Sequence, residues 1–212
     1  DELDRAVKAV PALGGQLFVS LPDGASCSVV SGLSSPGSPM TASSPLKIWS
    51  ISKTFTHVEI LRLVEKGKLQ LDQSLRDFEK AFPNLYQGYL ASYPQSHKIT
   101  LRQMLSHTSG IIDYMTLSEF LNNWQQSLAP GEIIALASKH QDEIQPGSIS
   151  RYSNTTMMIL SRIIEEITGD KFDSLIQQDV ISLAGLNSTY VANDTNGWGS
   201  TRGYQLSPCG QF

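Results

Sequence analysis

The sequence predicts an α+β fold in which a pair of strands comes first and helices dominate afterwards. Two runs rich in β-branched and aromatic residues, 14–20 (GGQLFVS) and 26–31 (SCSVVS), flank Pro22-Asp23-Gly24, which is a turn signal. From residue 50 onward, apolar residues recur at helical spacing. With 212 residues, of which 40% are hydrophobic, the chain can bury a sizeable core as one large domain or two small ones.

The N-terminal region is expected to contain a short helix, the hairpin and a loop. Leu3, Val7 and Val10 lie at helical spacing within residues 1–11. The stretch 32–45 is rich in Ser, Pro and Gly, which predicts a loop after the second strand.

The helical region begins with a long amphipathic helix over 50–66, which Gly67 ends. Thr100 can cap a short helix over 101–106. The apolar pattern predicts further helices over 117–126, 131–142, 155–168 and 172–182. The tail from Asn187 is polar and rich in glycine, and its pattern predicts little regular structure.

Composition excludes several classes of function. The formal net charge is −4 and Lys and Arg form no block, so nothing indicates a nucleic-acid partner. No apolar run approaches the roughly 20 residues of a membrane-spanning helix. The four histidines show no metal-ligand spacing, so we expect them on the surface or in loops and expect no metal and no cofactor.

The two cysteines, Cys27 and Cys209, lie near opposite ends of the chain. We expect them to be unrelated small apolar residues. The alternative is a bridge that closes most of the chain into one loop, which requires an oxidising compartment.

The most informative motif is Ser50-Ile51-Ser52-Lys53, which opens the long helix. Residues three apart project from the same face of a helix, so the Ser50 hydroxyl and the Lys53 amine come within hydrogen-bonding reach. A serine nucleophile needs an adjacent base, and an amine can be that base.

A second group is Tyr152-Ser153-Asn154, immediately before the apolar helix predicted over 155–168. A phenol can relay a proton, and an amide can orient a substrate by donating and accepting hydrogen bonds. Taken singly, Tyr152 has an alternative interpretation as a packing residue at the helix start, and Asn154 as a helix N-cap. Ser50, Lys53, Tyr152 and Asn154 together make a coherent set for acyl transfer.

Three ordered segments resemble the serine β-lactamase and penicillin-binding protein superfamily. The closest branch contains the class C β-lactamases, the D-alanyl-D-alanine carboxypeptidases and related esterases. The segments are 48–75 (IWSISKTFTHVEILRLVEKGKLQLDQSL), 99–114 (ITLRQMLSHTSGIIDY) and 145–172 (QPGSISRYSNTTMMILSRIIEEITGDKF). The resemblance covers roughly residues 40–210.

The resemblance implies a β-lactamase-like fold and a serine hydrolase that acts through an acyl-enzyme on peptide, β-lactam or ester carbonyls. Ser50 would be the nucleophile, Lys53 and Tyr152 would share the roles of base and acid, and Asn154 would hold the substrate amide. One oxyanion donor would be the backbone N–H of Ser50. An extracytoplasmic (periplasmic or secreted) bacterial location is also implied.

The chain departs from the family pattern at its C-terminal end. Members carry a third element, Lys-Thr-Gly or His-x-Gly, on a later strand, and residues 200–203 (STRG) have only a faint likeness to it. We therefore expect a chain truncated at the C-terminus, whose sheet is incomplete. A second chain or a C-terminal fragment would then pair with the hairpin edge. Loss of one oxyanion donor typically slows such enzymes about 100- to 1000-fold.

These arguments predict three regions. Residues 1–45 form the helix and hairpin of the sheet domain, 46–186 form the helical domain with the motifs, and 187–212 form a loop-rich tail. The alternative function is a non-catalytic ligand-binding or assembly homologue that is inactive because the third motif is missing. A purely structural helical domain is a third interpretation, which the ordered motifs disfavour.

Overall fold

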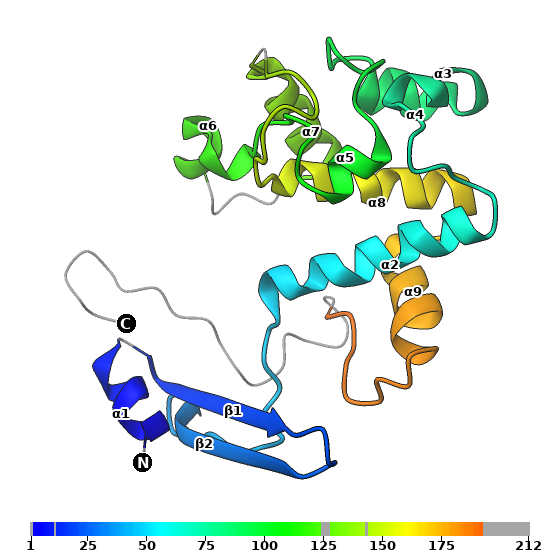
Figure 1. Ribbon diagram of the computed structural model, residues 1–212. Coiled ribbons are helices and arrows are strands. Elements are labelled where there is room, and N and C mark those ends of the chain that lie inside the picture. Colours follow the sequence, from blue (N-terminus) through cyan, green and yellow to red (C-terminus); the bar gives the residue numbers. More distant parts are fainter. Residues whose placement is uncertain (1, 11, 124–127, 143, 193–212) are drawn as a thin grey trace. The chain divides into compact units, whose positions relative to one another are not determined.

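The computed structural model describes residues 2–10, 12–123, 128–142 and 144–192 (Figure 1). Contacts along the chain divide it into two units. Among the described residues, one contains those up to Trp49 together with Ala192, and the other is Ser50–Val191. Cys209 and residues 200–203 lie outside the described residues, and Cys27 is exposed.

The first unit contains a helix and a small antiparallel sheet. The helix is α1 (Glu2–Ala9), and the strands are β1 (Gly14–Ser20), β2 (Ser26–Ser35) and β3 (Ser38–Pro39), in the order β1-β2-β3. The predicted hairpin is therefore present. Its register pairs Gly14 with Gly32 and Ser20 with Ser26.

The second strand is longer than the sequence predicts, so the loop predicted over 32–45 is wrong at its start. Gly32 continues β2 with a φ of 76°, a backbone conformation that favours glycine. A Cβ at Gly32 would lie 2.2 Å from the carbonyl oxygen of Leu13. This glycine is needed for close approach of the backbones, although its Ser- and Gly-rich context resembles a loop.

The second unit is helical and is built around two long helices, α2 (Ser52–Glu65) and α8 (Asn154–Thr168). They contact one another in the core (Figure 1). A 3₁₀ turn, η1 (Trp49–Ile51), precedes α2. The other principal helices are α5 (Leu101–Leu105), α6 (Ser118–Leu121), α7 (Pro130–Lys139) and α9 (Phe172–Leu175), which continues as the π-helix η5 (Ile176–Ser182).

The core of this unit consists of the apolar stripes of α2 and α8. Ile60 and Leu63 of α2 and Ile159, Leu160 and Ile163 of α8 are all fully or almost fully buried. Burial of each such side chain contributes about 1.5–3 kcal/mol relative to its exposure. The core therefore holds the two helix starts, where the motifs lie, in a defined relation.

Several short helices between residues 75 and 116 are not predicted by the sequence. They are η2 (Leu75–Asp77), α3 (Phe78–Ala81), α4 (Pro83–Leu85), the π-helix η3 (Tyr86–Leu90) and η4 (Tyr114–Thr116). Each is too short to show a helical period, and Pro83 interrupts the series. Their apolar side chains, such as Phe78 and Leu90, nevertheless complete the core.

Helix ends agree with the predictions at α5 and α8 and differ at α6 and at α7, which ends at Lys139 rather than at residue 142. Thr100 accepts a hydrogen bond from the backbone of Gln103 and forms a capping box at α5. Gly169 ends α8 in the left-handed conformation. The helix predicted over 117–126 is interrupted, because α6 ends at Leu121 and a turn follows at 122–123; residues 124–126 lie outside the described residues.

Candidate active site

The Ser50 and Lys53 side chains meet at the start of α2. Ser50 lies in the 3₁₀ turn and Lys53 in the first turn of the α-helix. The Lys53 side-chain nitrogen donates to the Ser50 hydroxyl, with an Nζ–Oγ distance of 3.1 Å. This is the contact that the three-residue spacing predicts.

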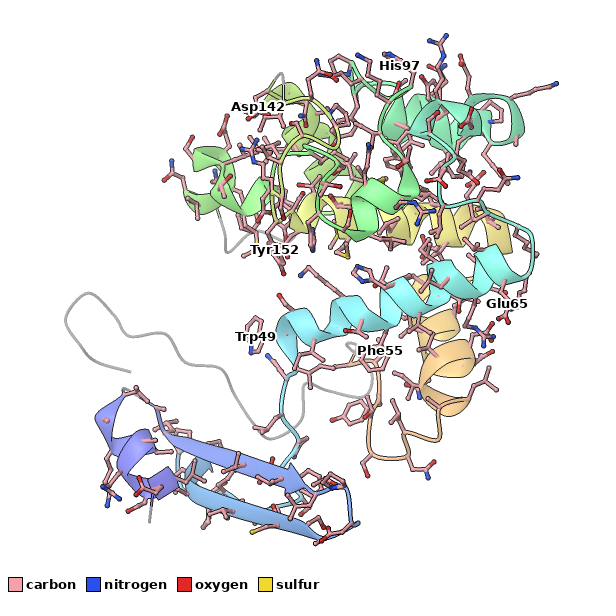
Figure 2. All side chains as sticks on the ribbon, in the orientation of Figure 1. Trp49, Phe55, Glu65, His97, Asp142 and Tyr152 are labelled. Atoms are coloured by element: carbon pink, nitrogen blue, oxygen red, sulfur yellow. The ribbon has the colours of Figure 1, made fainter. Side chains whose placement is uncertain are left out.

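Tyr152 reaches the same hydroxyl from the segment before α8. Its phenol oxygen lies 2.7 Å from the Ser50 Oγ, and the Lys53 Nζ lies 4.9 Å from the centre of its ring. Figure 2 shows Tyr152 at the start of α8, where it faces the N-terminal turns of α2. The structure therefore brings Ser50, Lys53 and Tyr152 together. The alternative interpretation of Tyr152 as a packing residue is wrong, because 47% of its surface is exposed.

The neighbours of Tyr152 change its acidity. Desolvation by itself raises the pKa of the phenol, but the hydrogen bonds to Lys53 and Ser50 and the charge of Lys53 outweigh it. The net effect lowers the pKa of Tyr152 below its ordinary value of 10.0. A phenol with a lowered pKa is a better general base near neutral pH.

Asn154 is held by Asp113, which the sequence analysis missed. The Asn154 side-chain NH₂ donates to the Asp113 carboxylate (2.9 Å), and its backbone N–H donates to the other carboxylate oxygen (3.2 Å). Asp113 is 8% exposed. The Asp113 carboxylate therefore fixes the orientation of the Asn154 side-chain amide.

The interpretation of Asn154 as a helix N-cap is wrong, because Ser153 is the cap of α8. The Ser153 hydroxyl accepts from the backbone N–H of Thr156 and donates to the Ile112 carbonyl. Asn154 is the first residue of the helix, so its side chain does not cap it.

His107 is a second residue to which the sequence analysis assigned no role, although it opens the segment His107-Thr108-Ser109-Gly110. Its ring lies 4.6 Å from the Tyr152 ring, and its Nδ1 accepts from the backbone N–H of Ser153. Its carbonyl accepts from the backbone of Arg151, so the 107–110 loop supports the segment that carries Tyr152. Desolvation, followed by the charge of Lys53, lowers the pKa of His107. The only signal in the sequence was its place in the His-Thr-Ser-Gly segment.

The expectation that the histidines lie on the surface or in loops is wrong for His57. This residue is on α2, one turn after Lys53, and its Nε2 is buried without a hydrogen-bond partner among the described residues. Desolvation, together with the charges of His107 and Lys53, lowers its pKa. A neutral imidazole is therefore favoured beside Lys53.

The part of the chain that the structure describes offers neither a metal site nor a membrane span. No group of three His, Cys, Asp or Glu side chains there could hold a metal ion. No helix there is long and apolar enough to cross a membrane.

Comparisons with known proteins identify the family of the chain. The Beta-lactamase family model matches residues 6–206. A penicillin-binding protein of Bacillus subtilis (strain 168) is 31% identical over 159 residues, which are 73% of this chain and 32% of that protein. The chain spans about a third of the length of the curated relatives it matches.

Solved structures show the same fold. An octameric penicillin-binding protein homologue from Pyrococcus abyssi has a TM-score of 0.77 at 25% identity, over 98% of this chain and 47% of that chain. A D-amino acid amidase from Ochrobactrum anthropi SV3 has a TM-score of 0.75 at 22% identity, over 98% of this chain and 55% of that chain. The chain therefore belongs to the beta-lactamase family, within the superfamily of serine β-lactamases and penicillin-binding proteins.

Proposed function

We propose that the chain carries the nucleophile and the proton-transfer groups of a serine hydrolase, which acts through an acyl-enzyme on peptide, β-lactam or ester carbonyls. The observation that carries the proposal is that the Ser50 Oγ lies within hydrogen-bonding distance of both Tyr152 and Lys53. A hydroxyl held between an amine and a phenol has a path for its proton when it attacks a carbonyl.

In the acylation step, Ser50 Oγ forms a bond to the substrate carbonyl carbon while its proton passes to the Lys53–Tyr152 pair. The backbone N–H of Ser50 donates to the developing oxyanion. Tyr152 then returns a proton to the leaving group as the acyl carbon–leaving group bond breaks. Water hydrolyses the resulting ester on Ser50, with the same pair now acting as the base.

Asn154 is the proposed contact to the substrate. Its NH₂ group is already engaged by Asp113, so its oriented side-chain amide, and the carbonyl oxygen in particular, is the group offered to a substrate N–H. A peptide or β-lactam with a side-chain amide satisfies this acceptor.

The proposal extends to the surroundings of the site. A second chain or a further segment pairs with the outer edge of β1, which has no strand partner among the described residues and exposes Leu17, Phe18 and Val19.

The three regions 1–45, 46–186 and 187–212 remain the proposed domains. The likeness to penicillin-binding proteins supports an extracytoplasmic bacterial location.

The direct test is covalent labelling with a fluorescent penicillin and a reporter ester, read by intact mass and peptide mapping. We expect one acyl adduct on the peptide that contains Ser50. Ser50→Ala removes the nucleophile and should abolish the adduct. Ser52→Ala, on an exposed serine in the first turn of α2, is the matched control and should label normally.

A folded chain that forms no adduct and turns over none of several acyl donors would contradict the proposal. That result would favour the non-catalytic ligand-binding or assembly homologue. Equal labelling of Ser50→Ala and the unaltered chain would instead assign the adduct to another nucleophile.

A further inference from the structure

His107 holds the backbone on both sides of Tyr152. The backbone N–H of Arg151 donates to the His107 carbonyl at 2.7 Å, and the backbone N–H of Ser153 donates to the His107 Nδ1 at 3.3 Å. Between these two hydrogen bonds, the imidazole and phenol rings lie 4.6 Å apart, centre to centre, at an interplanar angle of 36°. A single residue therefore contacts the phenol ring and both of its flanking backbone amides.

These contacts are important because burial does not fix the Tyr152 side chain, which is half exposed. Its phenol oxygen lies 2.7 Å from the Ser50 Oγ, the distance at which the two oxygens can exchange a proton. A misplacement of about 1 Å in an active site can slow the reaction about 100-fold. The position of the phenol therefore depends on the neighbours that hold its segment.

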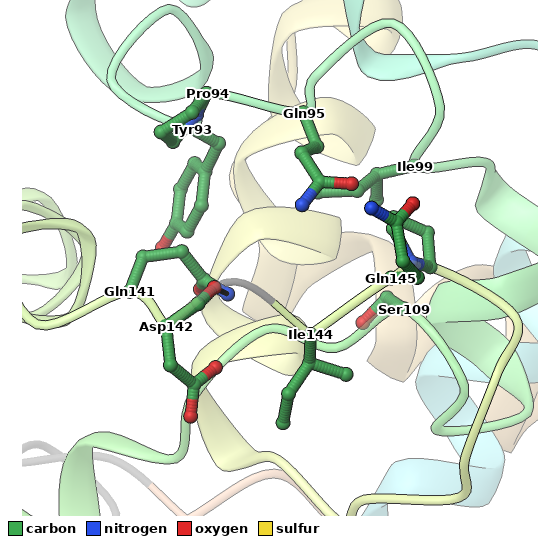
Figure 3. A pocket seen from close by; sticks show the side chains of 10 residues that line it. Tyr93, Pro94, Gln95, Ile99, Ser109, Gln141, Asp142, Ile144 and Gln145 are labelled. Atoms are coloured by element: carbon green, nitrogen blue, oxygen red, sulfur yellow. Dashed lines mark hydrogen bonds between the residues drawn. The ribbon is translucent and has the colours of Figure 1, made fainter.

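The loop that carries His107 is anchored by a residue that follows α7. The Gln141 side chain donates to the Gly110 carbonyl (2.9 Å) and accepts from the Ile112 backbone N–H (3.3 Å). Figure 3 shows Gln141, together with Ser109 of the loop, at the pocket that both segments line. These bonds give the imidazole a defined place beside the phenol.

The hydrogen bond from Ser153 also determines which nitrogen of His107 carries a proton. A backbone N–H can only donate, so the Nδ1 must offer a lone pair, and the proton of the neutral imidazole lies on Nε2. Desolvation, followed by the charge of Lys53, lowers the pKa of His107 below its ordinary value of 6.5, against the attraction of Asp113. The neutral imidazole is therefore favoured at pH 7.

Titratable groups of three segments surround the imidazole. They are Lys53 and His57 of α2, Asp113 of the loop, and Tyr152 before α8. The neighbouring Arg151 guanidinium is paired with Asp142. A proton added to the His107 Nδ1 would remove the acceptor for Ser153 and place a second cation near Lys53.

We propose that His107 is a positioning residue for Tyr152, and that only its neutral form, with Nδ1 unprotonated, holds the phenol against Ser50. As the pH falls below the pKa of His107, Nδ1 takes up a proton, the hydrogen bond from Ser153 breaks and the phenol leaves its place. This role rests on the proposed function, because the group that His107 positions is one of the proposed proton-transfer groups. The result is a site that acid switches off through a residue without contact to the reacting atoms.

The first test is NMR of the full chain, which needs no activity. Imidazole ¹⁵N shifts should show the Nε2–H tautomer of His107 at pH 7 and a titration midpoint below 6.5. The nuclear Overhauser effect between the Tyr152 ring and the Ser50 β-protons should weaken with the same midpoint. In His107→Asn it should persist at low pH, because this side chain keeps an acceptor oxygen, does not titrate and tolerates the φ of 56° at this position.

The second test is single-turnover acylation by a reporter ester across pH. Below the pKa of His107, the logarithm of the rate should fall with a slope of about two in the unaltered chain and about one in His107→Asn, which has one titrating group fewer. His107→Phe keeps a ring but removes the acceptor, so at pH 7 it should be acylated at least about tenfold more slowly than His107→Asn. His97→Asn, on an exposed histidine, is the control and should keep the steeper slope.

Several results would overturn the proposal. They are an Nδ1–H tautomer at pH 7, a Tyr152–Ser50 Overhauser effect that does not change before the chain unfolds in acid, and a steep limb that persists in His107→Asn. The last result would assign the second proton to another group, such as His57. If the unaltered chain is not acylated at all, the proposed function fails, and the Overhauser measurement still decides whether His107 positions Tyr152. That measurement also suffices if His107→Phe does not fold.

Discussion

Tyr152 and Lys53 form a coupled pair around the Ser50 hydroxyl. The phenol is half exposed, so burial contributes little to its orientation, and its position depends on its polar and ring contacts. Lys53 is the neighbour that lowers the pKa of Tyr152 both as a hydrogen-bond donor and as a charge. The lysine therefore determines the pH at which the phenol can accept a proton.

This dependence predicts a shift in the pH profile of acylation. Lys53→Met removes the donor and the charge, so the pKa of Tyr152 should rise and the ascending limb of the profile should move to higher pH. The maximal rate should also fall by about 100- to 10,000-fold, the usual contribution of a general base. Single-turnover acylation by a reporter ester, measured across pH, checks both effects. Lys66→Met, at the end of α2, is the control and should leave the ascending limb of the pH profile unchanged. An unchanged ascending limb in Lys53→Met would show that Lys53 does not lower the pKa of Tyr152.

Glu59 is a buried carboxylate on the helix that carries Lys53. It is 1% exposed, its Oε2 accepts from Arg62 Nε at 3.2 Å, and its Oε1 has no hydrogen-bond partner among the described residues. Desolvation, together with the charge of Asp179, raises the pKa of Glu59 above its ordinary 4.5, against the attraction of Arg62 and Lys66. The folded state therefore holds the Glu59 proton more tightly than the unfolded state does.

A raised pKa in the folded state has a defined effect on stability. The stabilising contribution of Glu59 is fully present below the pKa that it has in the unfolded state. This contribution is lost as the pH rises through the pKa of Glu59 in the folded state. Glu59→Gln keeps the shape without the charge, so it should raise the free energy of unfolding at pH 7 and give no gain at pH 3. Urea unfolding at both pH values measures this difference. Glu65→Gln, at an exposed position of α2, is the control, and a loss of stability at pH 7 in Glu59→Gln would contradict the argument.

At the scale of elements, the start of α8 is the junction that positions the site. Ser153 is fully buried, caps the helix and donates to Ile112, while the adjacent Tyr152 and Asn154 carry the polar groups of the site. Ser153, Asn154 and Thr155 thus join the start of α8 to the 107–113 segment. The apolar period of α8 predicts the helix, but nothing in that period distinguishes Ser153 from Asn154 as the cap.

Removal of this cap should destabilise the unit and misplace its neighbours. Ser153→Ala is expected to reduce the free energy of unfolding by about 1 kcal/mol, as for other N-caps, because the Ile112 carbonyl still accepts from the Thr155 hydroxyl. Chemical denaturation measures the loss. Ser161→Ala, further along α8, removes a hydroxyl that donates only to the carbonyl one turn earlier, at Met158, and should cost less. Equal costs for the two variants would argue against the cap.

For the whole molecule, the sequence predicted what depends on local spacing. The fold class, the hairpin and the long helices follow from periodicity, and the contact of Ser50 with Lys53 follows from helical geometry. The α+β, β-lactamase-like fold is confirmed by the structural comparisons. The contact of Ser50 with Tyr152 spans about half of the chain, so the local pattern could not predict it, and it was expected only as part of the chemically coherent set.

The rest was missed because it depends on contacts between distant segments. Asp113 contacts Asn154, and His107 contacts Tyr152, only because folding brings distant segments together. Single polar residues in loops show no periodicity that would identify them in the sequence. The short helices between 75 and 90 are stabilised by their burial rather than by their own patterns. Gly32 was misread because glycine serves both loops and closely packed strands.

Ser50, Lys53, Tyr152 and their supporting residues all belong to the unit Ser50–Val191. The contacts among Ser50, Lys53 and Tyr152 are therefore internal to one unit and do not depend on the register of the small sheet. Substitutions in β1 or β2 should leave these three side chains in contact.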